Sequence, residues 1–219
     1  MKTISVILPI NNPAMLSQPD LQPYQSEDCH FQLSYVDTEL KELNSVEDAA
    51  KVMPLVLDRI VEAERAKAAA VIVYAFGDVA VKEGKSLVSI PVMGLGKSAT
   101  HMASLLCRNA YTIIPGQLSH NAFIKDLVAE ENLQQKFKLA KHSVRMNPSE
   151  LKNNPVTLER LIEAASAEII EQNIDTFTLG CGCFIGVAKP LEQALRKQHK
   201  KAITVVDPVT VPFNIAQAL

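Results

Sequence analysis

The sequence predicts an α/β protein of two pseudo-symmetric lobes, each a mainly parallel sheet flanked by helices, with the active site in the cleft between them. Three observations support this fold class. Strand-length apolar runs alternate with helix-length amphipathic stretches over the 219 residues. The run at residues 69–75 is almost wholly apolar, which is typical of a central parallel strand buried on both faces. A pattern of strand, small residue, glycine and helix occurs at Ala75 and again at Cys181.

The first lobe is expected to comprise residues 1–96 together with residues 207–219. Its strands are predicted at residues 3–8, 31–36, 69–75 and 90–93. Residues 14–30 are rich in Pro, Gln and Ser and are predicted to form a loop. Ser45 is a typical N-cap, and the helix that it begins extends to about residue 67 because apolar residues recur at helical spacing.

The second lobe is expected to comprise residues 97–206. Its strands are predicted at residues 111–114, 175–179 and 202–206. Its helices are predicted at residues 99–109, 119–130, 155–172 and 187–200. A last short helix reaches residue 219, in the stretch assigned to the first lobe. The helix start at Pro155 is the clearest, because Asn154 is a good N-cap and proline suits the first helical position. No pattern assigns residues 131–148.

Composition excludes several classes of function. The formal net charge of −2 does not favour binding to nucleic acid or to an anionic membrane. No apolar run approaches the length of a membrane span, and the N-terminal strand lacks the long apolar region and cleavage site of a signal peptide. The protein is therefore expected to be cytoplasmic, with its four cysteines as free thiols.

Residue spacing argues against a metal site and a nucleotide site. Cys181 and Cys183 have no second Cys or His pair at a fitting distance, so no metal is expected. The Gly-Lys-Ser triplet at residues 96–98 suggests a phosphate-binding loop. That motif needs a glycine five residues before Gly96, and Pro91 stands there instead.

Cys181 lies in the most informative stretch, the Leu-Gly-Cys-Gly-Cys-Phe-Ile-Gly of residues 179–186. The glycines on either side of it free the backbone, so the next N–H groups would form an anion site. A thiol at the N-terminus of the following helix would have a lowered pKa and would be a reactive thiolate. The alternative is that Cys181 and Cys183 are small buried hydrophobic residues, as free cysteines often are.

Asn11 and Asn12 follow the first predicted strand, between Pro9 and Pro13. Ligands of open α/β sheets bind at the carboxyl ends of the strands, where the amides of these residues would act as donors. A polar turn explains the same residues equally well, because Asn and Pro favour turns.

Three short segments carry a recognisable pattern over most of the chain. The first is Ala-Phe-Gly-Asp at residues 75–78, followed by Ile-Pro-Val-Met-Gly at residues 90–94. The second is the cysteine segment, residues 175–186, and the third is residues 203–209 with Asp207-Pro208. In order and spacing they resemble the aspartate/glutamate/hydantoin racemase superfamily, and its hydantoin racemase branch in particular.

The resemblance implies a reaction without a cofactor, in which one thiolate removes a proton from a stereocentre and a thiol on the opposite face returns one. Cys181 matches the thiol of the second lobe, and the neighbouring N–H groups would bind the carboxylate or enolate oxygen. The implied substrate is a small molecule with a carboxylate or a hydantoin ring, and relatives are usually homo-oligomers. The expected substrate-binding residues are Asn11, Phe76, Gly77, Thr112, Gly182 and Cys183.

Ala75 departs from the family, whose first cysteine falls at this position. A methyl group neither takes nor gives a proton, and loss of an acid–base group typically lowers a rate by about 100- to 10,000-fold. Three interpretations stay open: a racemase from which an engineered change removed the thiol, a single-cysteine lyase resembling arylmalonate decarboxylase, and a small-ligand binder without turnover. The decarboxylase pattern has hydroxyl side chains just after this position, where this chain has Phe76 and Gly77.

Overall fold

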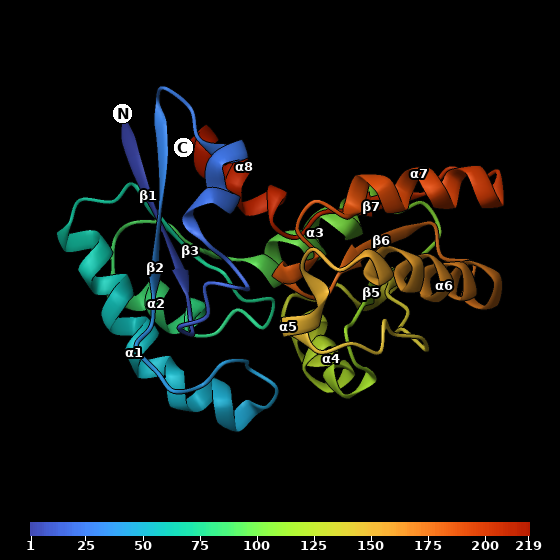
Figure 1. Ribbon diagram of the computed structural model, residues 1–219, viewed down its shortest axis with the longest axis horizontal. Coiled ribbons are helices and arrows are strands. Elements are labelled where there is room, and N and C mark those ends of the chain that lie inside the picture. The colour runs from blue at the N-terminus through green and yellow to red at the C-terminus, as the bar shows by residue number, and fades with distance from the viewer. The chain divides into compact units, whose positions relative to one another are not determined.

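The computed structural model describes residues 1–219, which divide into two compact units. Unit 1 comprises residues 1–95 and 212–219, and unit 2 comprises residues 96–211. Each unit is built on its own sheet, and every strand pair in both sheets is parallel. Helices flank both sheets (Figure 1), so the predicted α/β architecture of two parallel sheets flanked by helices is confirmed.

The sheet of unit 1 has four strands in the order β2-β1-β3-β4. They are β1 (Lys2–Leu8), β2 (Cys29–Tyr35), β3 (Ala70–Val73) and β4 (Val92–Gly94). The helical elements of the unit are η1 (Gln18–Tyr24), α1 (Val46–Arg65), α2 (Val81–Leu87) and α8 (Thr210–Ala218). In Figure 1, α1 and α2 lie on one side of this sheet and α8 lies on the other.

The two faces of this sheet bury different side chains, because successive residues of a strand point to opposite faces. Ile7 and Val71 belong to the apolar cluster that includes Val56 of α1. On the opposite face the ring of Phe31 stacks on that of Phe213, with 4.7 Å between centroids. The C-terminal helix α8 therefore completes the core of the N-terminal sheet.

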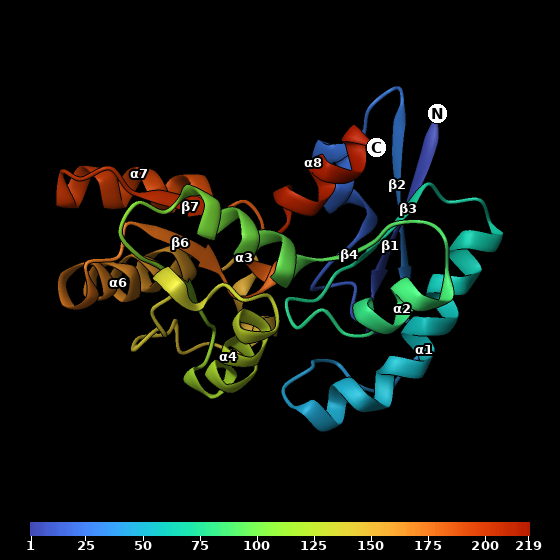
Figure 2. The same ribbon diagram turned by 180° about the vertical axis from the view of Figure 1, so that it is seen from behind.

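The sheet of unit 2 has three strands in the order β5-β6-β7. They are β5 (Tyr111–Ile114), β6 (Thr176–Leu179) and β7 (Thr204–Val206). The helices are α3 (Leu95–Leu106), α4 (Asn121–Glu130), α5 (Pro148–Leu151), α6 (Pro155–Gln172) and α7 (Ala188–His199). Three short 3-10 turns are η2 (Leu118–His120), η3 (Gln134–Lys136) and η4 (Gly182–Phe184). Helices α6 and α7 pack together on one side of the sheet, and α3 lies on the other side, nearest the viewer in Figure 2.

Capping residues confirm the two helix starts that the sequence predicts most clearly. Ser45 Oγ accepts the N–H of Asp48 at 3.0 Å, and Asn154 Oδ1 accepts the N–H of Val156 at 3.0 Å. Pro155 occupies the first turn of α6, where its missing N–H costs nothing.

Three local predictions are wrong. The loop predicted at residues 14–30 contains η1, because the Asp20 carboxylate accepts both the N–H and the hydroxyl of Ser17 at 2.7 Å. The helix predicted at residues 99–109 begins four residues earlier, because β4 ends at Gly94 and α3 starts directly afterwards at Leu95. Cys107 lies just beyond α3 instead of inside a helix, and its thiol donates to the carbonyl of Ser104 at 3.2 Å.

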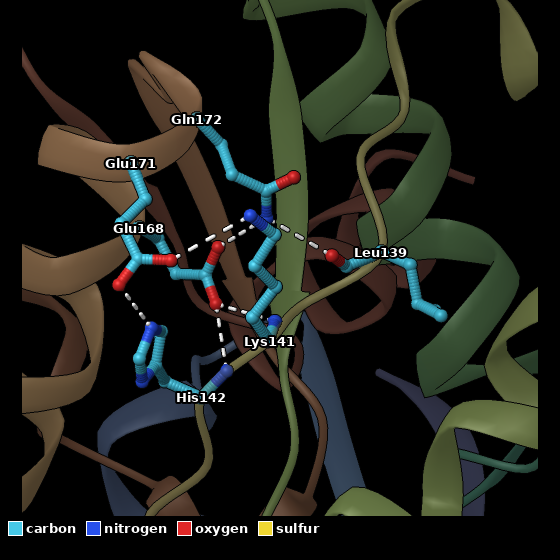
Figure 3. Close-up of polar contacts among 6 residues, drawn as sticks. All are labelled: Leu139, Lys141, His142, Glu168, Glu171 and Gln172. Atoms are coloured by element: carbon cyan, nitrogen blue, oxygen red, sulfur yellow. Dashed lines mark hydrogen bonds and ion pairs between the residues drawn. The ribbon is translucent and has the colours of Figure 1, made fainter.

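The long irregular segment before α5 is held in place by a buried carboxylate. Glu168 of α6 is fully buried, and its Oε1 accepts the N–H groups of Lys141 at 2.6 Å and His142 at 2.8 Å. Gln172, one helical turn later, donates to Glu168 and to the carbonyl of Leu139 (Figure 3). The segment therefore has a defined conformation that its own sequence pattern does not specify.

We expect Glu168→Ala to lower the free energy of unfolding by about 3 kcal/mol, because two main-chain N–H groups and one side-chain amide lose a charged acceptor. Glu171→Ala is the matched control. Glu171 is on the same helix face and pairs with His142 at 2.9 Å, but it is exposed, so the expected loss is below about 1 kcal/mol. Chemical denaturation of both variants tests this, and equal losses would contradict the buried role of Glu168.

Candidate functional site

Gly180 sets the position of the turn that follows β6. Its N–H donates to the carbonyl of Ile114 at 2.8 Å. A Cβ on this residue would lie 3.1 Å from that oxygen and 3.3 Å from the Cα of Pro115, closer than the main chain accepts without a shift. Glycine thus lets β6 end directly against the loop after β5. Cys181 follows at the carboxyl edge of the sheet, where α/β proteins bind their ligands.

Cys181 is the partly exposed member of an otherwise buried turn. Its backbone is extended, and its Sγ accepts the N–H of Cys183 at 3.4 Å. Gly182 and Cys183 are buried. The Cys183 N–H therefore faces the sulfur of Cys181, a contact that strengthens when the acceptor carries negative charge. The expectation that both cysteines are buried hydrophobic residues describes Cys183 but not Cys181.

A short 3-10 turn and a left-handed glycine separate Cys181 from the helix that follows, whose predicted start is residue 187. Residues 182–184 form the 3-10 turn η4, and Gly186 then adopts a left-handed φ of 80°. Helix α7 begins only at Ala188. Cys181 is therefore the N-cap of η4 and does not lie in the first turn of α7, and the N–H that its sulfur accepts belongs to η4.

Asp207 lies at the carboxyl end of β7, the strand next to β6. Its Oδ1 accepts the N–H of Val209 at 2.8 Å and that of Thr210 at 3.3 Å. The N–H of Gly186 also stabilises its charged form. Burial nevertheless outweighs these donors and raises the pKa of Asp207 above its usual value. One carboxyl group therefore joins the end of the cysteine turn to the segment after β7.

We expect Asp207→Asn to stabilise the protein at pH 7. A raised pKa in the folded state means that the folded protein binds this proton more tightly than the unfolded chain does. The wild type therefore loses stability as pH rises from the unfolded pKa through the folded pKa, whereas Asn keeps an acceptor and carries no charge. The advantage of the variant should shrink as pH falls toward 4, measured by denaturation at several pH values.

Asp48→Asn provides a control of opposite sign. The N–H of Asn44 and the contacts with Ser45 lower the pKa of Asp48. This carboxylate therefore contributes stability above its unfolded pKa, and that contribution disappears as pH falls through the folded pKa. The variant should be less stable than the wild type at pH 7 and equal to it at low pH. A shift of the same sign in both variants would contradict the assignment for Asp207.

Three of the predicted residues of unit 1 lie after β3. Ala75 is partly exposed, Phe76 is buried and Gly77 is exposed, with nothing near the place where its Cβ would be. Asn11 follows the neighbouring strand β1 and is also exposed. Because β1 and β3 are adjacent and parallel, Asn11 and the turn at residues 75–77 share one edge of the sheet.

Thr112 lies apart from the residues at the edge of its sheet. It is fully buried in β5, and its hydroxyl donates to the carbonyl of Lys138 at 2.6 Å. The side-chain amide of Asn12 already has a partner within the protein, because it donates to the carbonyl of Lys41 at 3.0 Å. The structure thus gathers Cys181, Gly182 and Cys183 at one sheet edge, and Thr112 faces the interior of the same unit.

Asp78 is a residue that the sequence reasoning did not single out for a role. It is buried, has a left-handed φ of 50°, and its N–H donates to the carbonyl of Ala75 at 3.1 Å. Any Cβ on Gly94 would overlap its carboxylate. The signal in the sequence is the glycine at the end of the next strand, which leaves the space that a buried carboxylate occupies.

The structure brings no group of three or more His, Cys, Asp or Glu side chains into an arrangement that could hold a metal ion. No helix combines the length and the apolar character that crossing a membrane requires.

Two parallel sheets with a cysteine turn at a carboxyl edge are typical of α/β proteins that bind small molecules at the carboxyl ends of their strands. The family model of Asp/Glu/hydantoin racemases matches residues 33–216. The chain therefore belongs to the Asp/Glu/hydantoin racemase family.

Individual relatives agree with this assignment. The chain is 26% identical over 152 residues to hydantoin racemase of Paenarthrobacter aurescens, a match that covers 68% of this chain and 61% of the relative. Allantoin racemase from Klebsiella pneumoniae has a TM-score of 0.85 at 18% identity, over 100% of this chain and 87% of that one. Arylmalonate decarboxylase has a TM-score of 0.68 at 16% identity, over 99% and 92%. At such identities the two structures show a shared fold.

Proposed function

We propose that this chain transfers a proton at the stereocentre of a hydantoin or an amino-acid-type substrate, without a cofactor, and that Cys181 is the acid–base group. The observation that carries the proposal is the turn after β6. It presents one partly exposed thiol at the carboxyl edge of the sheet, and a neighbouring N–H faces the sulfur. Membership of a racemase family supports the same chemistry.

In the proposed step the Cys181 thiolate takes the α-hydrogen, and the electron pair of the C–H bond moves into the adjacent carbonyl group. The main-chain N–H groups of the cysteine turn would stabilise the oxygen that becomes negative. Return of a proton from the same thiol restores the original enantiomer, whereas inversion needs a donor on the opposite face. Ala75 replaces the family's other thiol, so this chain should exchange the α-hydrogen and invert the centre slowly or not at all.

A second candidate is a single-cysteine decarboxylase of the arylmalonate type. The methyl group at residue 75 favours it, because decarboxylation needs one proton donor instead of two. In that reaction the bond to the carboxylate breaks, carbon dioxide leaves, and the Cys181 thiol protonates the remaining carbanion. The fold shared with arylmalonate decarboxylase supports this alternative.

Proton NMR in heavy water distinguishes the two candidates. Single enantiomers of 5-benzylhydantoin, aspartate and glutamate are incubated with the protein, and loss of the α-hydrogen signal and optical rotation are followed together. The racemase proposal expects exchange that outpaces any loss of rotation. Phenylmalonate is incubated separately, and release of carbon dioxide with no exchange on the other compounds would replace the proposal with the decarboxylase. If no compound showed either α-hydrogen exchange or release of carbon dioxide, both the racemase and the decarboxylase proposals would be contradicted.

A further inference from the structure

The turn after β3 is held by a chain of main-chain hydrogen bonds. The N–H of Ala75 donates to the carbonyl of Val73 at 2.9 Å, and the N–H of Asp78 donates to the carbonyl of Ala75 at 3.1 Å. The carbonyl of Asp78 accepts the N–H of Val81, the first residue of α2, at 3.1 Å. Both main-chain polar groups of Ala75 therefore have partners, and one of these partners is Asp78.

Asp78 and Ala80 have backbone conformations that residues with a Cβ rarely adopt. Their φ values are +50° and +62°, in the left-handed region, although neither residue is glycine. Aspartate visits this region more readily than alanine does, and both residues are buried. Strained residues of this kind persist only where the surrounding structure enforces them, and they cluster at functional sites.

The carboxylate of Asp78 lies directly against the end of β4. Gly94 is the last residue of β4, and in the sheet it pairs with Val73, the last residue of β3. If Gly94 carried a Cβ, that atom would lie 3.0 Å from Oδ2 of Asp78 and closer still to Oδ1. The side chain of Asp78 thus rests on the main chain of the neighbouring strand, at a place where only glycine leaves room.

This contact bears on residue 75. A buried carboxylate loses hydration, and glycine would adopt the left-handed backbone at position 78 with no charge to bury. The carboxylate instead joins the turn at residues 75–78 to β4, at the sheet edge where α/β proteins bind their ligands. Because Asp78 also donates to the carbonyl of Ala75, the position of its side chain constrains the conformation of residue 75.

We propose that Asp78 is a positioning residue for the side chain at position 75, and that its contact with Gly94 holds the turn in the conformation that the reaction needs. This inference rests on the proposed function, because it takes position 75 to serve one face of the substrate. Asp78 transfers no proton itself. It determines how fast a thiol at position 75 acts, whereas the action of Cys181 is independent of it.

Hydrogen exchange tests the structural half of the inference without any substrate. Gly94→Ala displaces the carboxylate and leaves residue 78 unchanged, so the intrinsic exchange rate of the Asp78 amide stays the same. We expect this amide to exchange at least about 10-fold faster in the variant, relative to the hydrogen-bonded amide of Val71 in β3. Gly84→Ala is the matched control, because a Cβ there would come closest to the flexible end of the Ile60 side chain, at 2.7 Å. It should leave the Asp78 amide unchanged.

The functional half is tested in the Ala75→Cys background, by proton NMR of single enantiomers in heavy water. Asp78→Gly removes the carboxylate and leaves the left-handed backbone unstrained. It should slow exchange of the enantiomer that requires the thiol at position 75 by about 10- to 100-fold, because a misplacement of about 1 Å can cost on the order of 100-fold. Exchange of the enantiomer that the parent protein already exchanges through Cys181 should not change. Asp78→Asn keeps the shape of the side chain and should show a smaller loss.

A double variant checks that the contact itself is responsible and that the effects do not come from general unfolding. Asp78→Gly vacates the space that a methyl group at position 94 needs. Gly94→Ala should therefore lower Tm less in the Asp78→Gly background than in the parent chain. Additive changes in Tm would overturn the inference.

The outcomes separate this inference from the proposed function. An unchanged Asp78 amide in Gly94→Ala, or equal slowing of both enantiomers in Asp78→Gly, would overturn the inference. If Ala75→Cys exchanged only the enantiomer that the parent exchanges, the role of position 75 in the proposed function would fail. A faster Asp78 amide in Gly94→Ala would in that case still uphold the role of Asp78 in holding the turn.

Discussion

Cys181→Ala is expected to lower the rate of α-hydrogen exchange by about 100- to 10,000-fold, because the variant loses the only proposed acid–base group. The fold should be retained, since this side chain is partly exposed and its sulfur accepts an N–H from its own turn. Proton NMR in heavy water measures the exchange rate, and thermal denaturation checks the fold.

Cys107→Ala is the control for the loss of a thiol. Cys107 is buried beyond the end of α3, and burial raises the pKa of its thiol, so it is a poor base at neutral pH. This variant should exchange the α-hydrogen at the wild-type rate while losing some stability. Exchange that survives Cys181→Ala would mean that another group carries the chemistry.

Ala75→Cys is expected to confer inversion, at a rate at least about 100-fold above that of the parent, because it supplies the missing proton donor. Optical rotation of a single enantiomer should then decay at a rate close to that of α-hydrogen exchange. Ala50→Cys, which places an exposed thiol on α1, should leave both rates unchanged and so controls for the mere presence of a fifth cysteine.

The double variant Ala75→Cys with Cys181→Ala provides a sharper test of the same idea. Of the two thiols proposed to act on the substrate, only the one at position 75 would remain, and it would serve the opposite face of the substrate. The parent and the double variant should therefore exchange opposite enantiomers. The same enantiomer preference in both would show that residue 75 does not serve the second face, and the racemase proposal would then fail.

Much of the fold was accessible from the sequence because it depends on local patterns. The run that became β3 is apolar throughout, and its burial on both faces follows from that composition. Asn154 and Pro155 specify the start of α6 by capping and by a fixed φ, which act within one turn. The cysteine turn was likewise recognisable, because two glycines and a thiol at the end of a strand are local features.

The parts that were missed depend on partners distant in sequence. Residues 131–148 have no periodicity, and their conformation is imposed by Glu168 from another element. The position of Thr112 in the interior follows from its bond to Lys138, 26 residues later. The start of α7 at Ala188 agrees with the predicted start at residue 187, but the 3-10 turn and the left-handed glycine between Cys181 and this helix were not predicted.

The sequence by itself determined the alternation of strands and helices, the family, and the turn that carries Cys181, because periodicity, capping and motif spacing are properties of neighbouring residues. Tertiary structure alone decided that Cys181 is open while Cys183 is buried. It also decided that Asp207 holds the end of the cysteine turn through the N–H of Gly186. Burial and long-range hydrogen bonds depend on which elements pack together, and no stretch of neighbouring residues encodes them.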